Sequence, residues 1–319
     1  MQSKRILLAG EPMALFLAQT PGPLEAADSY RCAIAGAEYN VAVGLARLGH
    51  RVDYLTVLGR DPFGRRIARA LQAEGIGCGL LRWSDDRRTG FMLKGLAEQG
   101  DPDIFYYRAG SAASTLCPAD VERLELSAYD HIHLTGITPA LSPSCREAVL
   151  LLARRAREAG ISLSFDPNLR PQLWPDADIM RSTIHTLAAL CDIFLPGAGE
   201  SRTLCGAGDA AAAAAYYCAA GTPCVIVKAG PGGACWQAGA NGGFVPGFAV
   251  PRVVDTVGAG DGFAAGVISA RLEGLDWPAC VARGNAIGAI QVMNRGDNEG
   301  LPTRPELEDF LAGRGRYFA

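Results

Sequence analysis

The sequence predicts an α/β fold of three layers, αβα, with a mostly parallel central sheet and a small antiparallel β lid. Strand-like runs alternate with helical stretches along most of the chain, and such alternation closes into right-handed βαβ units. Two regions break this alternation because they contain strand-like runs with no helix between them. No repeat or linker divides the chain, so we expect one domain over residues 1–319, with the lid formed from about 12–35 and 84–110.

Hydrophobic spacing and end signals place the individual elements. Residues 62–74 form a helix that opens on Pro62 and ends at Gly75, and Ser142 caps a helix that continues to about residue 159. Apolar residues at helical spacing predict a helix over 36–48. Buried strands are expected at 5–9, 52–58, 131–134, 161–165, 193–195 and 224–228, and lid strands within 21–31, at 90–96 and at 104–107.

Composition narrows the class of protein. Hydrophobic residues make up 49% and charged residues 20% of the chain, as in a packed soluble protein. A net charge of −3 argues against a general nucleic-acid binder, which would carry a basic excess. Glycine is abundant, with 39 of 319 residues. Ordered proteins use glycine where the backbone turns tightly or approaches a ligand.

Cysteine usage and hydropathy predict a cytoplasmic protein. The ten cysteines are scattered without a CxxC pair, and the four histidines offer no zinc spacing, so we expect reduced thiols. An uncharged stretch at 210–227 is nominally long enough to span a membrane. Because it contains Gly221 and Pro223, we interpret it as a helix, a turn and a buried strand, and expect no membrane partner.

The most informative stretch is VVDTVGAGDGFAAG at 253–266. A β-run is expected to end at Val254 and a helix to start after Gly260, so Gly258 and Ala259 lie in a turn leading into a helix N-terminus. Free N–H groups and the helix dipole favour an anion there. Asp261 then lies in the first helical turn, where it is either a dipole-complementing carboxylate or a base beside the anion hole.

Two nucleotide-binding motifs are excluded at this position. The spacing GxGxxG is not met, because Phe263 stands where the third glycine belongs, and the chain contains no GxxxxGK[ST]. The tripeptide GAG at 258–260 fits a glycine-rich turn with a capping aspartate as well as it fits an anion hole.

DTVGAGDGFAAG is similar to the C-terminal signature of the ribokinase-like (PfkB) carbohydrate kinases. AGAEYNVA at 35–42 and GRDPFG at 59–64 resemble two further motifs of that family, so the resemblance spans essentially the whole chain. It implies ATP and Mg²⁺ as cofactors and leaves a monovalent cation such as K⁺ open. The residue roles that it implies are Asp261 as catalytic base, Gly258, Ala259 and Gly260 as anion hole, Lys228, Gly230, Gly233 and Asn285 at ATP, and Glu200 at the metal through water.

Within the family, the chain most resembles the branch that acts on 2-keto-3-deoxygluconate. FYYR at 105–108, HLTGITPALS at 133–142, FDPNLRP at 165–171 and RGD at 295–297 carry this similarity. It implies a sugar-acid site lined by Gly36, Asn40, Tyr106, Arg108, Ile137, Arg170 and Asp297.

Side-chain chemistry supports an acidic substrate independently. The planar guanidinium groups of Arg108 and Arg170 suit a carboxylate. They could instead be a solvated edge-strand charge and a loop residue held by Asp166, respectively. Tyr106 and Tyr107 alternate across a strand, so at most one of them faces the sugar. His131 and His133 share a strand face without a partner signal and are expected to be structural.

Three departures from the family pattern leave the substrate open. Ala35 replaces a glycine, Gly197 replaces an asparagine associated with phosphate and magnesium, and Met92 stands where a tyrosine could touch the sugar. The alternatives are a kinase of fructose, ribose, a nucleoside or 2-keto-3-deoxygalactonate, a non-catalytic sugar-binding protein of the same fold, or an NAD-dependent dehydrogenase. The lid also offers an exposed face through which a homodimer or higher homo-oligomer could form.

Overall fold

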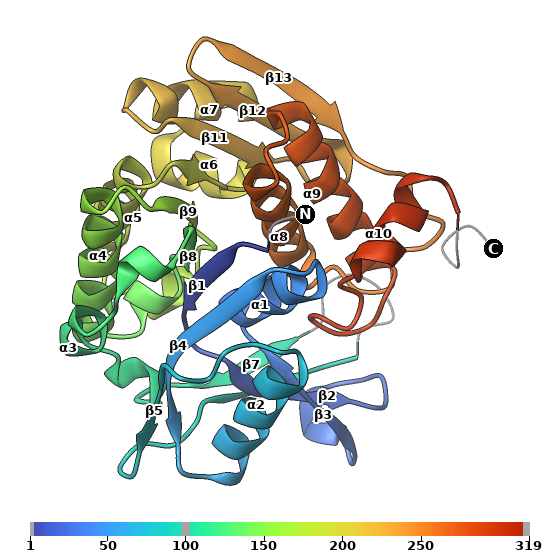
Figure 1. Ribbon diagram of the computed structural model, residues 1–319. Helices are drawn as coiled ribbons and strands as arrows, with labels where there is room; N and C mark the ends of the chain where they lie inside the picture. Colours follow the sequence, from blue (N-terminus) through green and yellow to red (C-terminus); the bar gives the residue numbers. More distant parts are fainter. Residues whose placement is uncertain (1–2, 97–102, 315–319) are drawn as a thin grey trace.

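A nine-stranded sheet with helices on both faces forms the body of the computed structural model, which describes residues 3–96 and 103–314 (Figure 1). The seven strands from β11 to β5 run parallel, and β12 and β13 add an antiparallel hairpin at one edge. Across the sheet lie β13 (Asn241–Pro246), β12 (Gly233–Ala238), β11 (Cys224–Lys228), β10 (Ile193–Phe194), β9 (Ser162–Asp166), β8 (His131–Thr135), β1 (Arg5–Ala9), β4 (Arg51–Gly59) and β5 (Leu81–Ser84).

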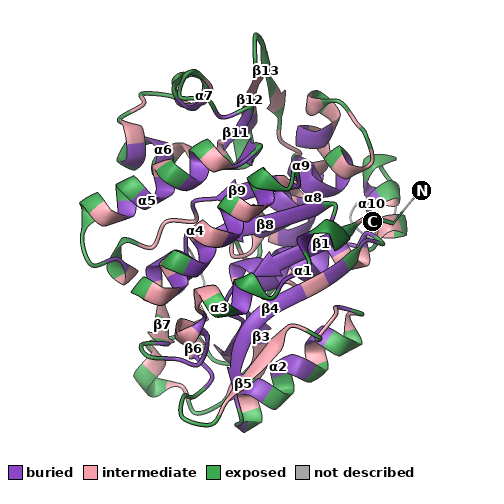
Figure 2. Cartoon of the chain, turned by 60° about the vertical axis from the view of Figure 1, so that its left-hand side comes forward, coloured by how far each residue is buried: buried purple, intermediate pink, exposed green. Residues whose placement is uncertain are grey.

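Alternate residues of the central strands enter two separate cores, one on each face of the sheet. Figure 2 shows that the central strands are buried along most of their length, whereas the helices outside them carry many exposed residues. Ile6 and Leu8 of β1 point into one core, and Leu7 and Ala9 into the other. One core is covered by α1 (Ala37–Arg47), α2 (Pro62–Ala73), α8 (Ala259–Leu272), α9 (Trp277–Val292) and α10 (Arg304–Leu311). The other is covered by α3 (Pro118–Glu122), α4 (Pro143–Glu158), α5 (Ala177–Leu190), α6 (Ala198–Cys205) and α7 (Ala210–Ala219). The predicted αβα layering is confirmed.

A second, four-stranded sheet is inserted into this body, as predicted. Its order is β3 (Tyr30–Ala35), β2 (Met13–Ala18), β6 (Phe91–Lys94) and β7 (Ile104–Tyr107). The two outer pairings are antiparallel, and the central pairing of β2 with β6 is parallel. This parallel pairing joins two chain segments that are separated by α1, β4, α2 and β5.

Two expected strands differ in the structure. Residues 21–29 contain no strand, because Pro21 and Pro23 interrupt the ladder, and β2 and β3 lie on either side of them. The β-run expected to end at Val254 is absent as well. The N–H of Val254 donates to the carbonyl of Val292 at the end of α9 (2.7 Å) rather than to a neighbouring strand, so residues 252–256 form an irregular segment.

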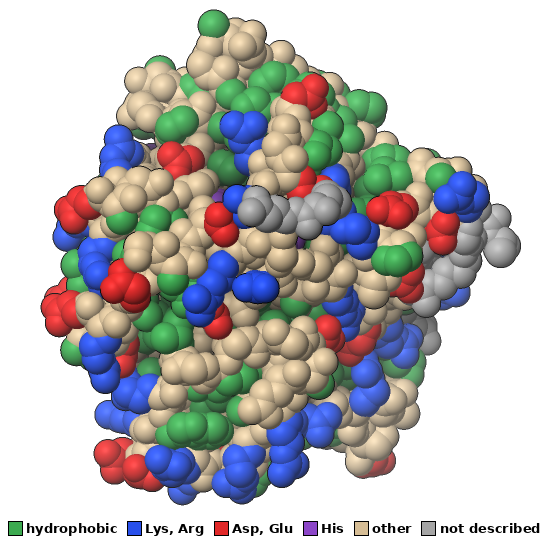
Figure 3. Space-filling view, in the orientation of Figure 1, with side chains coloured by type: hydrophobic (Ala, Val, Ile, Leu, Met, Phe, Trp, Pro, Cys, Tyr) green, Lys and Arg blue, Asp and Glu red, His purple; other side chains and the backbone are tan. Residues whose placement is uncertain are grey.

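The interpretation of the uncharged stretch as a helix, a turn and a buried strand agrees with the structure. The stretch at 210–227 forms α7, a turn at Gly221 and the buried strand β11. Within 3–96 and 103–314, no helix is both long and apolar enough to cross a bilayer. All ten cysteines are free. On the face shown in Figure 3, acidic and basic side chains are interspersed, with the basic ones most numerous along the lower edge.

Glycines allow α8 to pack closely against α9. A Cβ atom on Gly266 would lie 2.8 Å from the Cα of Gly284 and 2.9 Å from the carbonyl oxygen of Arg283. Backbone atoms cannot yield as a flexible side chain does, so the two helices approach as far as their main chains permit. The contact fixes the position of α8, and with it the helix N-terminus that the sequence associates with an anion.

We therefore expect Gly266→Ala to lower the free energy of unfolding by about 1–3 kcal/mol, because the added methyl overpacks a rigid contact. Gly199→Ala is the matched control, since a Cβ at Gly199 of α6 meets only the end of the Arg202 side chain, at 4.0 Å. That control should gain up to about 1 kcal/mol from the better helix former. Urea unfolding of both variants measures the difference, and equal stability of the two would contradict the packing argument.

Candidate active site

A cavity of about 500 Å³ lies where the carboxyl ends of the central strands meet the small sheet and the N-terminus of α8. It is the setting in which most of the predicted site residues come together. Those lining it are Gly36, Asn40, Tyr106, Arg108, Ile137, Arg170, Glu200, Lys228, Gly258, Gly260, Asp261 and Asp297. Its walls therefore combine residues that the sequence assigned to sugar, to phosphate and to metal.

The turn before α8 requires glycine. Gly258 has φ +80°, and a Cβ there would lie 2.0 Å from the carbonyl oxygen of Asp297. This left-handed residue ends the irregular segment and starts α8 at Ala259, so that the N–H groups of the first turn lack helical partners. These N–H groups and the helix dipole form the predicted anion-binding position.

Asp261, the third residue of α8, is held by two amides. Its Oδ2 accepts a hydrogen bond from Nδ2 of Asn40 (2.7 Å), and its Oδ1 accepts one from Nδ2 of Asn168 (3.3 Å). Asn40 is in turn oriented by Asn298, which donates to its Oδ1 (3.0 Å). The structure thus places Asn40, predicted to contact the sugar, beside the carboxylate of Asp261.

Burial raises the pKa of Asp261 to about 7. The hydrogen bond from Asn40 and the charges of Lys228 and Arg170 favour the ionised form, and the negative charge of Asp166 opposes it. A carboxylate with a pKa near neutrality is well matched to accept a proton from a hydroxyl group.

Lys228 brings a positive charge to the same helix N-terminus. Its Nζ contacts Oδ2 of Asp166 (2.5 Å), and a Cβ on Gly260 would lie 3.7 Å from that Nζ. Burial disfavours the charged ammonium, but Asp166 and Glu200 together raise the pKa of Lys228 above its ordinary value. A permanent cation therefore stands beside the anion-binding turn.

Glu200 holds two backbone segments together. Its Oε1 accepts from the N–H of Leu169 (2.7 Å), and its Oε2 accepts from the N–H of Gly197 (2.6 Å) at the start of α6. Among residues 3–96 and 103–314, no group of three or more His, Cys, Asp or Glu side chains could hold a metal ion. Glu200 lines the cavity with both carboxylate oxygens already engaged by backbone N–H groups.

Four predicted residues lie outside the cavity. Ala259 is not among the residues that line it, and Gly230 and Gly233 flank the turn between β11 and β12, with φ +59° and +119°. Asn285 on α9 donates to the carbonyl groups of Val245 and Pro246, both at 3.1 Å, and so ties α9 to the end of β13.

The small sheet supplies the opposite wall. Arg108, which follows β7, is buried and pairs through Nε (2.8 Å) and Nη2 (2.6 Å) with Oε2 of Glu11. Its guanidinium lies 5.7 Å from the ring centre of Tyr106. Tyr107 points to the other face of the sheet and stacks on Phe91 at 4.6 Å. Arg108 is therefore not a solvated edge charge, and Tyr106 is the tyrosine that faces the cavity.

Arg170 differs from the other two basic residues of the wall. Its Nη1 donates to the carbonyl of Leu169 (2.8 Å), and it forms no ion pair with the described part of the chain. The alternative that Asp166 holds Arg170 is wrong, because Asp166 is engaged by Lys228. Arg170 is thus available to an anion in the cavity.

Sequence reasoning missed several acidic residues of the wall. Glu38 is buried, and its Oε1 accepts from the hydroxyl groups of Thr135 (2.6 Å) and Thr138 (2.7 Å); burial raises its pKa. Glu11 was missed because its partner, Arg108, is 97 residues away. Glu38 lies within the AGAEYNVA motif, two residues after Gly36, and this position was its only signal in the sequence.

The two strand histidines are structural, as predicted. His131 and His133 are fully buried and share the hydroxyl of Ser164 at 2.8 Å each. Burial lowers the pKa of both to about 3, so they stay neutral.

A carboxylate base, an anion-binding helix N-terminus and a fixed ammonium are suited to phosphoryl transfer to a hydroxyl group. Residues 4–304 match the family described as pfkB family carbohydrate kinase. The chain therefore belongs to the pfkB family of carbohydrate kinases, which confirms the predicted enzyme class.

Individual relatives are similar over nearly the whole chain. The 2-dehydro-3-deoxygluconokinase of Bacillus subtilis (strain 168) is 45% identical over 306 residues, which cover 96% of this chain and 94% of that protein. A crystal structure of a PfkB protein from Polaromonas sp. JS666 superimposes with a TM-score of 0.88 at 43% identity, covering 96% of this chain and 99% of the other. A putative ribokinase II from E. coli in complex with ATP and Mg²⁺ gives 0.89 at 28% identity, covering 98% and 100%.

We expect Asp261→Asn to lower kcat by about 10²–10⁴-fold, the usual contribution of a general base. ATP binding should change little, because the anion-binding turn and Lys228 are kept. Steady-state kinetics and nucleotide titration measure the two effects separately. Near-native turnover in this variant would rule out Asp261 as the base.

The pH dependence of kcat/KM should show an acidic limb near pH 7, since activity is lost as Asp261 becomes protonated. Asn40→Ala removes a hydrogen bond that favours the carboxylate, so the pKa of Asp261 rises and the limb moves to higher pH. Asn294→Ala is the control, because its amide donates to the carbonyl of Ile290, away from the cavity. A limb that stays in place or moves to lower pH in Asn40→Ala would contradict this account.

Proposed function

We propose that the protein transfers the terminal phosphoryl group of ATP to the terminal hydroxyl of 2-keto-3-deoxygluconate. The observation that carries this proposal is one cavity whose lining includes both Asp261 and Lys228 and the two arginines Arg108 and Arg170. The similarity to a 2-dehydro-3-deoxygluconokinase, 45% identical over nearly the full chain, supports the choice of substrate.

Asp261 accepts the proton of the attacking hydroxyl as that oxygen bonds to the terminal phosphorus of ATP and the bond from this phosphorus to the bridging oxygen breaks, which releases ADP. Its position at the start of α8 places this proton transfer beside the N–H groups of Gly258, Ala259 and Gly260, which stabilise negative charge on the transferring group. Lys228 adds a fixed positive charge there. Magnesium, when bound with ATP, neutralises part of the phosphate charge, and Glu200 is the cavity residue placed to hold one of its water ligands.

The small sheet lies over the sugar and excludes water, which limits hydrolysis of ATP. Met92 and Tyr106 give this wall an apolar surface that can cover the deoxy carbon of the substrate. Gly36 lies below them, and a Cβ there would meet the carbonyl of Glu11 at 2.7 Å. A side chain at that position would therefore narrow the sugar site.

The carboxylate of the substrate binds Arg170 and the free edge of Arg108. Arg170 has no acidic partner among the described residues, and Nη1 of Arg108 makes no hydrogen bond within them. Glu11 fixes the guanidinium of Arg108 from behind, so its plane is already oriented when the sugar acid arrives.

Arg170→Ala should raise KM for the sugar acid by about 10–10²-fold, the effect of losing a hydrogen bond to a charged group. KM for a neutral ketose such as fructose should stay nearly unchanged. Arg181→Ala, an exposed arginine on α5, is the matched control and should affect neither substrate. Equal effects of Arg170→Ala on acidic and neutral sugars would show that Arg170 does not bind the carboxylate.

The direct test of the proposed function is ATP-dependent ADP release with a panel of sugars and sugar acids. 2-Keto-3-deoxygluconate should give the highest kcat/KM, above its galactonate epimer, fructose, ribose and nucleosides. A higher kcat/KM for a neutral sugar would replace the proposed substrate within the same kinase family.

A homodimer formed through the outer face of the small sheet is also part of this proposal. Phe105 and Tyr107 on β7 are 61% and 53% exposed, which is unusual for large apolar side chains on a sheet edge.

The proposed location is the cytoplasm. Ten free cysteines support such a reducing compartment.

A further inference from the structure

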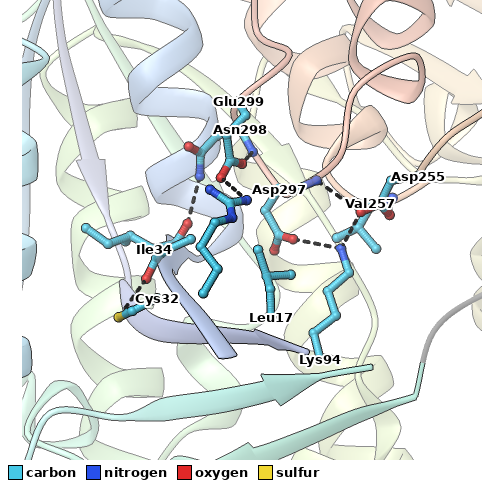
Figure 4. A network of polar contacts seen from close by, with 12 residues as sticks. Leu17, Cys32, Ile34, Lys94, Asp255, Val257, Asp297, Asn298 and Glu299 are labelled. Carbon is cyan, nitrogen blue, oxygen red and sulfur yellow. Dashed lines mark hydrogen bonds and ion pairs between the residues drawn. The ribbon is translucent and has the colours of Figure 1, made fainter. Parts of the chain in front are cut away.

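Lys94, at the end of β6, is a buried cation outside the groups used so far. Only 2% of its side chain is exposed, and its Nζ lies 2.7 Å from Oδ2 of Asp255 and 3.0 Å from Oδ1 of Asp297. Both carboxylates belong to the αβα body, whereas Lys94 belongs to the small sheet (Figure 4). The ammonium therefore joins the sugar side of the cavity to the segment before α8.

The two carboxylates organise the backbone around the anion-binding turn. Oδ1 of Asp255 accepts from the N–H of Val257, and Oδ2 accepts from the N–H of Gly296, both at 3.1 Å. The carbonyl of Asp297 packs directly against Gly258. One cation thus holds together the two backbone segments that place Gly258 at the start of α8.

Attachment of the small sheet alone does not account for this arrangement. Arg31 on β3 and Glu299 already join the same two parts of the molecule at the surface, at 3.0 Å and with 45% and 33% of their side chains exposed. A buried ion pair is costly to desolvate, and an apolar contact commonly holds two surfaces together as well. The placement of Lys94 therefore points to a role in geometry rather than in attachment.

We propose that Lys94 is a positioning residue whose ammonium sets the anion-binding turn through Asp255 and Asp297. The proposal rests on the phosphoryl-transfer function assigned above. Met92 and Lys94 lie two residues apart on β6 and so share a face of the small sheet. A substrate that contacts Met92 therefore contacts the same strand that carries the ammonium of Lys94. This shared strand couples sugar binding to the geometry of the phosphoryl site.

Without the ammonium, two buried carboxylates would face each other with no countercharge. Either they move apart or one takes up a proton, and in both cases the hydrogen bonds from Val257 and Gly296 lose their present geometry. The turn before α8 would then be displaced, whereas the ion pairs of Arg108 and Lys228 do not involve Lys94 or its two carboxylates and would stay intact. The expected signature is a loss in kcat with little change in KM.

The test is Lys94→Ala, assayed for kcat and for KM of both substrates. We expect kcat to fall by about 10–10²-fold, the scale of a small misplacement of catalytic groups, with KM for ATP within about 2-fold of the native value. Ammonium or methylammonium ions, which fit the space left by the side chain, should restore part of kcat. Tetramethylammonium at the same ionic strength is too large and should not.

Arg31→Met is the matched control, because it removes the exposed ion pair between the same two parts and should leave kcat near native. Three results would each overturn the proposal. They are a native kcat in Lys94→Ala, a loss of kcat that Arg31→Met reproduces, and a loss of kcat that no small cation restores. If Lys94→Ala does not fold, Lys94→Arg carries the test, since its larger head must shift the carboxylates and lower kcat at unchanged KM. Unchanged kcat in Lys94→Arg would then overturn it. The native enzyme is assayed in parallel with the same sugar acid. No turnover by the native enzyme would mean that the proposed substrate is wrong, which is distinct from a failure of the Lys94 proposal.

Discussion

The cavity must accommodate more negative than positive charge, and most of its local structure follows from this constraint. The acidic side chains on its wall are Glu11, Glu38, Asp166, Glu200, Asp261 and Asp297, and the basic ones are Arg108, Arg170 and Lys228. Buried carboxylates need donors or cations. Each of these carboxylates has one, from threonine hydroxyls, backbone N–H groups, asparagine amides or a paired basic residue. Asp261 receives only neutral amide donors, and it is the residue whose pKa approaches neutrality.

The same charge pattern separates groups that hold the site from groups that act in it. Glu11 forms an ion pair with Arg108, and Asp166 forms one with Lys228, so both cations are fixed before any ligand binds. Arg170 alone among the basic residues of the wall has no acidic partner in the described chain. The anionic sugar and ATP proposed above would thus meet a few oriented cations, and the net charge of −3 has no bearing on so small a volume.

The fold and the start of α8 after the glycine turn could be predicted from the sequence because their signals are local. Proline, serine and glycine mark the ends of α2 and α4, and GAG before Asp261 marks a helix N-terminus. The pairs that complete the site are not local. Glu11 meets Arg108, and Lys94 meets Asp255, over 97 and 161 residues, and no periodicity reports such contacts. The prediction of a strand before the turn was wrong for the same reason, since the hydrogen-bond partner of the Val254 N–H lies at the end of α9.

The parallel pairing of β2 with β6 has a consequence for how the molecule is made. Residues 13–18 cannot find their partner until residues 91–94 have been synthesised, and closing so long a loop is entropically slow. The turn before α8 and Asp261, at 258–261, come later in the chain than β6. A chain synthesised only as far as β6 therefore contains both partners of the central pairing but not the helix N-terminus that completes the cavity. The two walls of the cavity thus become available at different stages of synthesis.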